Sequence, residues 1–286
     1  MKRNYRFLKT IAAAFFGISS IAVNAQLTII ANSSYETGGI TNSGVVVMNT
    51  SGGTYHTWSQ ANGIAQIGAL SGGSFSGKST ISNDGTRISA VMTNTTSGNT
   101  EIALYNVPTT TWTNLGSLGA ASGNSASSTW GMSGDGNTIV GLGWISAGTA
   151  HAVKWTSAGG VVDLGSIVAG RSSRANAVNN DGSVIVGWQD EDSGGRRGAK
   201  WVDGVETFIL DNTGNTVGEA SGVSADGKTI IGQGMPNPYV WNEVSGLTYL
   251  THPNAGPFFR GGATAVSADG NTVIGYYRGF PAPPMS

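Results

Sequence analysis

Cysteine is absent from this chain of 286 residues, and only 11% of the residues are charged. A chain of this length can bury enough core to fold without disulfides, so their absence is compatible with export. Helical periodicity is also missing, because after residue 25 no segment of 12 residues repeats its apolar positions at helical spacing. No heptad or collagen period appears. The 45 glycines, with abundant Ser, Thr and Asn, favour short strands and tight turns in an all-β domain.

The N-terminus has the three parts of a secretory signal peptide. Lys2, Arg3, Arg6 and Lys9 precede the apolar run IAAAFFGISSIAV, and VNA then ends at Ala25. The apolar run is short for a membrane span, so cleavage after Ala25 is favoured over an uncleaved anchor. We therefore expect an exported protein, secreted, periplasmic or at the cell surface, with no transmembrane span after cleavage.

Basic residues are few in the remaining chain. Removing residues 1–25 takes away four of the 15 basic residues and none of the 16 acidic ones, which leaves 11 against 16 and a formal charge of −5. The longest basic stretch is then Arg196-Arg197. A phosphate backbone needs more positive charge than this, so nucleic acid is not expected as a partner.

One stretch of nine residues occurs almost twice, as SADGKTIIG from Ser224 and as SADGNTVIG from Ser267. Looser copies begin at Ser82, Ser133 and Asn179. Asp-Gly between two β-branched runs is a strong hairpin signal. The turn glycines lie 41 to 51 residues apart, which is the spacing of four-stranded propeller blades. They are Gly44, Gly85, Gly136, Gly182, Gly227 and Gly270.

Each repeat continues with an aromatic residue and, nine or ten residues later, with an aliphatic one. The aromatic slots are Trp58, Tyr105, Trp155, Trp201 and Trp241. A large aromatic residue that recurs in every repeat is typical of packing between units. We predict that residues 26–286 form a single all-β domain, a β-propeller of about six four-stranded blades. The last blade would be closed by an N-terminal strand, Leu27–Ile30, or be incomplete.

The repeats resemble the HAF family of extracellular repeat proteins of bacteria. The resemblance lies in NAVNNDGSVIVGW with AKW, and in GMSGDGNTIVG with AVKW and DLGSI, and it extends from about Gly39 to Gly275. The second repeat departs from the pattern, with Tyr105 in the aromatic slot and Ala90 in place of the usual Gly. The resemblance implies a secreted or surface-associated propeller, and it implies no catalytic residues.

The turn carboxylates suggest two roles, as ligands of calcium or as structural turn residues. Asp is a standard turn residue, and a whole repeat separates each carboxylate from the next, so the structural role is favoured. The set is Asp84, Asp135, Asp181, Asp226 and Asp269.

Other signals for chemistry are weak. His56, His151 and His252 occupy unrelated places in their repeats and show no zinc-like spacing. A Ser-His-Asp triad could be assembled from distant positions, but no nucleophile-elbow motif supports one. The inner strands, which contain AVS, GVS and AVN, offer mostly small neutral residues where a polysaccharide-cleaving propeller needs carboxylates. We therefore expect no catalytic residue, no metal and no cofactor.

The unrepeated loops are the better candidates for a binding site. In a propeller, the Asp-Gly turns lie on one face, and the second-to-third strand loops lie on the other with the blade connections. Loops on a rigid scaffold commonly bind ligands, and Trp, Tyr and Arg are the preferred anchors. The candidate residues are Trp144, Arg171, Arg174, Trp188, Asp190, Arg196, Arg197, Arg260, Tyr276 and Arg278.

The favoured function is therefore a secreted, non-catalytic propeller that binds a protein or a surface glycan through these loops. Two alternatives stay open. One is a hydrolase or lyase that acts on a polysaccharide, since propellers host such sites. The other is a structural component of the cell surface or of a biofilm.

Export is directly testable. Mass spectrometry of the protein from its native host should find an N-terminus at Gln26, because the residues before it match a signal peptide. A cytoplasmic product that begins at Met1 would contradict this prediction.

Overall fold

The computed structural model describes residue 30 and residues 35–72, 75–234, 237–251 and 259–279. The predicted signal peptide and residues 27–29 of the predicted closing strand lie outside these ranges. All 22 regular elements of the described part are β-strands. In the same part, no helix is long and apolar enough to cross a membrane.

The first three blades are antiparallel sheets of four strands, each paired in chain order. Blade 1 contains β1 (Tyr35–Ile40), β2 (Val46–Thr50), β3 (Thr54–Ser59) and β4 (Gly63–Ala69). Blade 2 contains β5 (Thr80–Ile81), β6 (Arg87–Thr93), β7 (Thr100–Asn106) and β8 (Thr111–Gly116). Blade 3 contains β9 (Ser127–Met132), β10 (Thr138–Trp144), β11 (Ala150–Thr156) and β12 (Gly160–Asp163).

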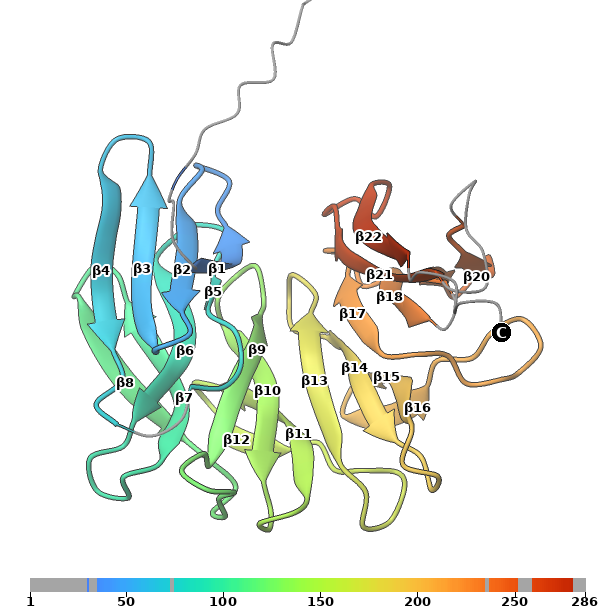
Figure 1. Cartoon of the computed structure of the whole chain (residues 1–286), viewed down its shortest axis with the longest axis horizontal. Helices are drawn as coiled ribbons and strands as arrows, with labels where there is room; N and C mark the ends of the chain where they lie inside the picture. The colour runs from blue at the N-terminus through green and yellow to red at the C-terminus, as the bar shows by residue number, and fades with distance from the viewer. Residues whose placement is uncertain (1–29, 31–34, 73–74, 235–236, 252–258, 280–286) are drawn as a thin grey trace, which may run out of the picture.

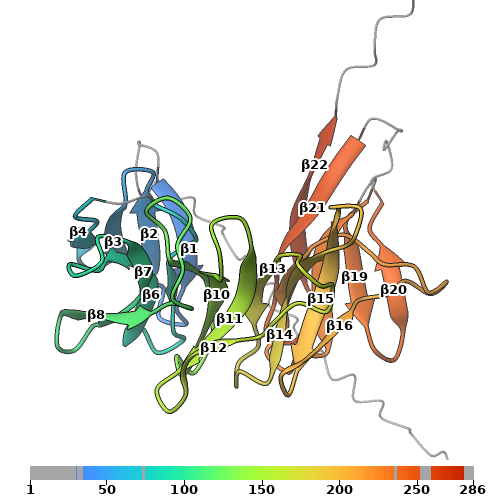
Figure 2. The same cartoon turned by 90° about the horizontal axis from the view of Figure 1, so that it is seen from below.

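Two further blades and a hairpin follow (Figures 1 and 2). Blade 4 contains β13 (Ser173–Val178), β14 (Val184–Asp190), β15 (Arg196–Val202) and β16 (Val205–Phe208). Blade 5 contains β17 (Ala220–Val223), β18 (Thr229–Gly234), β19 (Tyr239–Asn242) and β20 (Gly246–Tyr249). The hairpin contains β21 (Phe259–Val266) and β22 (Val273–Gly279).

The predicted all-β propeller is confirmed, but the predicted number of about six four-stranded blades is wrong. The described part of the chain has five, because the last of the six turns, at Gly270, joins only β21 and β22, and β21 pairs with β18 of blade 5 at Gln233–Gly262 and Gly234–Gly261. Each turn motif therefore marks one β-hairpin, and such a hairpin need not belong to a complete four-stranded blade. The predicted closure by Leu27–Ile30 falls almost wholly outside the described residues.

The repeated Ser-x-Asp-Gly sequence builds the same turn each time. In the fifth copy, Asp226 Oδ1 accepts hydrogen bonds from Ser224 Oγ at 2.6 Å and from the Lys228 backbone N–H at 3.1 Å. The Ser224 hydroxyl accepts from the Thr229 N–H at 3.0 Å, and Gly227 takes a φ of +77°, which glycine adopts without strain. Ser82 lowers the pKa of Asp84 in the same way, and Ser267 lowers that of Asp269.

These turns also join one blade to the next through backbone hydrogen bonds between residues at the same repeat position. Asn83 N–H donates to the Gly134 carbonyl at 2.9 Å, Asn180 N–H to Ala225 at 3.2 Å, and Ala225 N–H to Ala268 at 3.0 Å. Asn42 and Asp135 donate to the next copy as well, at 3.4 and 3.2 Å. We call this series the turn belt, and the face on which it lies the turn face.

The apolar core lies between neighbouring blades. One cluster joins Val140 and Ala152 of blade 3 to Ala175, Ile185 and Trp201 of blade 4. A second joins Val186 of blade 4 to blade 5. In the aromatic slots, Trp201 is 1% exposed and Tyr105 and Trp155 are buried, whereas Trp58 and Trp241 are half-buried.

The two ends of this series of blades are not paired with each other in the described part of the chain (Figure 1). Side chains at these two ends are accordingly exposed to solvent. Ile231 in β18 is fully buried, whereas its counterpart Ile274 in β22 is 61% exposed. Ile40 in β1 is likewise 66% exposed. The face of the hairpin that would meet a following blade is therefore open.

Ile231 and Ile274 form a matched pair, with the same residue type at the same repeat position. Ile231→Ala should lower the free energy of unfolding by about 2–5 kcal/mol, because it leaves a cavity in a packed interface. Ile274→Ala should cost less than about 1 kcal/mol, because its side chain is already largely in water. Urea denaturation of both variants measures the difference, and equal losses would mean that Ile274 is covered in solution.

Candidate ligand-binding site on the variable-loop face

A cavity of about 490 Å³ opens on the face opposite the turn belt, which we call the variable-loop face. It lies where β15 begins, where the connection from blade 4 to blade 5 passes, and where β18, β20, β21 and β22 come together. Its lining residues with functional side chains are Arg196, Arg197, Glu219, Gln233, Tyr249 and Tyr276. Gly218, Gly234 and Gly261 complete much of the wall with exposed backbone.

Bulges in the inner strands β9, β13 and β17 direct side chains toward the next blade. The pairing of β13 with β14 skips Asn176, and the pairing of β9 with β10 skips Trp130. Such a bulge redirects the extra residue out of the regular alternation. Asn176 Nδ2 then donates to the Ala220 carbonyl of blade 5 at 2.7 Å, and Ser221 repeats this contact with Ala263 at 2.6 Å.

The glycine that ends each VIG-like segment makes room for this bulged strand. A Cβ at Gly187 would lie 1.9 Å from the carbonyl oxygen of Arg174, which is closer than any side chain tolerates. Blade 2 has Ala90 at this place, and β5 begins only at Thr80, opposite Ser89. No strand partner therefore faces Ala90 on that side in the described pairing, which explains the departure from the repeat.

Arg174 lies at the centre of a polar cluster that spans blades 3, 4 and 5. Its guanidinium lies 3.7 Å from the ring centre of Trp130 and 5.3 Å from that of Trp188. It donates to Glu219 Oε1 at 2.7 Å, and Asn176 donates to the same oxygen at 2.8 Å. Burial lowers the pKa of Arg174, and the negative charge of Glu219 opposes that shift. Glu219 therefore already accepts hydrogen bonds from two side chains of the protein itself.

Arg196 differs from its neighbours because no carboxylate of the described residues lies within hydrogen-bond distance of its guanidinium. That group stacks on Trp188 at 4.1 Å from the ring centre, and its nearest ion-pair partner, Glu219 Oε2, is 3.9 Å away. The side chain is 52% exposed. Arg197 instead pairs with Glu191 at 2.6 Å, and this bond holds the pKa of Glu191 at about 2.

The structure unites some of the predicted site residues and separates others. Arg196, Arg197 and Tyr276 line the cavity, and Arg174 and Trp188 support it from behind, Trp188 being only 3% exposed. Arg171 donates to the Asp192 carbonyl in the neighbouring loops, and burial raises the pKa of Asp190 against the opposing charges of Arg196 and Arg171. Trp144, Arg171, Asp190 and Arg278 do not line this cavity, and the side chain of Arg260 lies outside the described part.

Sequence reasoning missed Glu219, Asn176 and Trp130, because it treated the inner strands as small and neutral. The signal was present in the repeat alignment. Seven residues before the turn Asp, three copies have Gly or Ser, but two neighbouring copies have Arg174 and Glu219. The first copy, with Ser43 in the Asp position, has Glu36 at this slot. Five residues before it stand Trp130 and Asn176. Opposite charges at one slot of adjacent repeats indicate a contact between blades.

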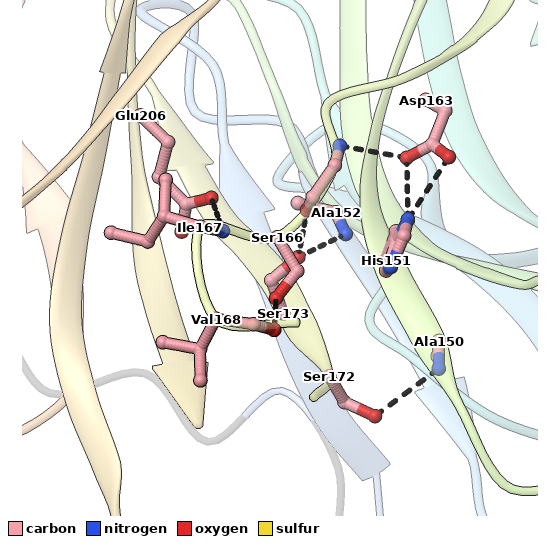
Figure 3. Close-up of polar contacts among 11 residues, drawn as sticks. Ala150, His151, Ala152, Asp163, Ser166, Ile167, Val168, Ser172, Ser173 and Glu206 are labelled. Carbon is pink, nitrogen blue, oxygen red and sulfur yellow. Dashed lines mark hydrogen bonds and ion pairs between the residues drawn. The ribbon is translucent and has the colours of Figure 1, made fainter. Parts of the chain in front are cut away.

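A second polar cluster lies at the junction of blades 3 and 4 (Figure 3). His151 Nδ1 contacts Asp163 Oδ1 at 2.9 Å, which is half of a possible triad. The nearby hydroxyls of Ser172 and Ser173 instead accept from the Ala150 and Ala152 N–H groups. Since a nucleophilic serine must bond to the imidazole, this cluster fixes the blade connection rather than forming a triad from the residues drawn.

Glu206 in the same region is a buried carboxyl. It is 9% exposed, its Oε2 accepts from the Ile167 N–H at 3.1 Å, and its Oε1 has no partner among the described residues. Burial raises the pKa of Glu206 to about 7, against the opposing effect of the Ile167 hydrogen bond.

No protein-family model and no curated protein sequence matches this chain. Solved structures match in fold. A TolB-like protein from Agrobacterium tumefaciens is 16% identical with a TM-score of 0.56, over 87% of this chain and 91% of that one. The β-propeller domain of the Trilobed protease from Pyrococcus furiosus, described as having an open velcro topology, is 12% identical with a TM-score of 0.55, over 89% and 80%.

TolB from Acinetobacter baumannii also matches, at 14% identity and a TM-score of 0.49, over 79% of this chain. The chain spans 59% of the length of that protein. At these identities, the first two similarities show a shared propeller fold and nothing finer.

The raised pKa of Glu206 gives the folded protein a specific pH dependence. Below about pH 4.5 the carboxyl is neutral in both the folded and the unfolded state. As the pH rises towards 7, ionisation of the folded form becomes costly. The free energy of unfolding should therefore fall over this window, on the order of 1–2 kcal/mol.

Glu206→Gln should abolish this decrease in the free energy of unfolding. The variant should therefore be more stable than the parent at pH 8 and similar to it at pH 4.5. Paired denaturation curves at both pH values cancel the contributions of other groups. If the parent and the variant show the same pH dependence, Glu206 titrates normally.

Proposed function

We propose that this chain is an exported, non-catalytic β-propeller that binds a protein or a surface glycan through the cavity on its variable-loop face. One observation above all supports this proposal. A cavity of about 490 Å³ combines a half-exposed arginine with two tyrosines, Tyr249 and Tyr276, that are 46% and 47% exposed. Its volume lies within the range of ligand pockets, about 300–1,000 Å³.

The state of the polar groups supports binding more than proton transfer. A general acid or base must have its proton or lone pair available to a substrate. Glu219, the carboxylate of the cavity wall, accepts hydrogen bonds from Arg174 and Asn176 and keeps both in place. The N-terminal sequence pattern and the resemblance to HAF repeats support the exported location.

The proposal predicts that ligand binding requires residues of the variable-loop face. A glycan array and a pull-down from the cell-surface fraction would identify candidate ligands. Arg196→Ala should then weaken binding at least tenfold, because it removes the most accessible charge of the cavity.

Lys228→Ala is the matched control. Lys228 is an exposed cation on the turn face, with its side chain 76% in water, so its removal should leave binding unchanged. Both variants should keep the parental melting temperature. A ligand whose affinity falls with Lys228→Ala and not with Arg196→Ala would place the binding site on the other face.

A further inference from the structure

We infer that the cavity on the variable-loop face recognises a carboxylate group on a sugar, as in a glycan that contains hexuronic acid. This inference rests on the proposed function and specifies the chemistry of its ligand.

The charge distribution points to one anionic group. The charged residues of the lining are Arg196, Arg197 and Glu219. Arg197 is paired with Glu191 at 2.6 Å, and Glu219 is paired with Arg174 at 2.7 Å. Among the described residues, no carboxylate oxygen lies within hydrogen-bond distance of Arg196. The nearest ion-pair partner, Glu219 Oε2, is 3.9 Å away, and Asp190 lies opposite Arg196 in the β14–β15 pairing. A carboxylate is the planar anion that a guanidinium binds through two parallel hydrogen bonds.

Arg196 is also held ready for such a ligand. Its guanidinium lies 4.1 Å from the ring centre of Trp188 while the side chain is 52% exposed, and this contact restrains the side chain and so lowers the entropy lost on binding.

The remainder of the lining suits a sugar ring. Tyr249 and Tyr276 offer half-exposed apolar faces with hydroxyl groups at their edges, and the exposed Gln233 adds an amide. Sugars present apolar C–H faces as well as hydroxyls, so they use both parts of a tyrosine. The glycine backbone of the wall lets a flat ring approach closely.

A peptide cannot add a strand to β18 at this place. Peptides commonly bind by adding a strand to a free sheet edge. At the cavity, Gln233 and Gly234 of β18 already pair with Gly262 and Gly261 of β21. The Gln233 N–H also donates to the Glu219 carbonyl at 2.9 Å. The β18 segment that borders the cavity is therefore already paired.

The test compares three probes by isothermal titration calorimetry with the whole exported chain. They are a trisaccharide of galacturonic acid, its full methyl ester, and tri-glutamate. The acid should bind at least tenfold more tightly than its ester, since only the acid has a carboxylate for Arg196. Tri-glutamate should bind more weakly than the acidic sugar.

Three variants distinguish the contribution of the Arg196 charge to binding from that of ring stacking. Arg196→Gln should reduce affinity for the acid at least tenfold and leave the affinity for the methyl ester unchanged. Lys228→Gln removes the same charge from the turn face and should affect neither probe. Tyr276→Ala should weaken both sugars, because ring stacking does not depend on the carboxylate.

Three outcomes would overturn the inference: equal affinity for the acid and its ester, preference for tri-glutamate, or no binding of the acid by the parent. If the acidic sugar fails but another ligand from the screen still depends on Arg196, the proposed function stands without this specificity. If no ligand depends on the variable-loop face, the proposed function fails as well.

Discussion

Backbone hydrogen bonds between neighbouring Asp-Gly turns set the position of each blade relative to the next. Most of these bonds join equivalent turn residues, as in the step from Asn180 to Ala225 and then from Ala225 to Ala268. These bonds involve only the backbone, and Asn, Gly and Ala all occur between Ser and Asp. The geometry of the turn cannot vary in this way, so Ser, Asp and Gly recur with little change.

This constraint restricts the sequence on one face of the propeller and not on the other. The turn face repeats itself because each turn must present its N–H and C=O groups in the same direction. The opposite ends of the same strands have no such requirement. They can therefore differ from blade to blade, and the cavity lies at those ends, between Arg196 of blade 4 and Tyr276 of the last hairpin.

Sequence reasoning succeeded where the physics is local. Hairpin turns and β-branched strands depend on neighbouring residues, so the periodicity predicted the propeller. The number of blades depends on which strands pair, and the pairing of β21 with β18 is not encoded in the turn motif. In the site, Arg196, Arg197 and Tyr276 were predicted from loop composition, whereas Trp188 was placed on the surface but lies buried beneath two arginines. Burial of that kind follows from packing between blades, which composition alone does not specify.

Two charged residues beside the cavity depart from the repeat, and each compensates the charge of the other. Arg174 and Glu219 occupy the same slot in adjacent blades, where the other copies have Glu36, Gly77, Ser128 and Gly262. Either charge alone would be costly to bury, but the two meet across the interface at 2.7 Å. Glu219 Oε1 accepts hydrogen bonds from both Arg174 and Asn176, and the other oxygen, Oε2, lies 3.9 Å from Arg196. Arg196 therefore has no direct hydrogen bond to Glu219, and its guanidinium lies over Trp188 with its side chain 52% exposed.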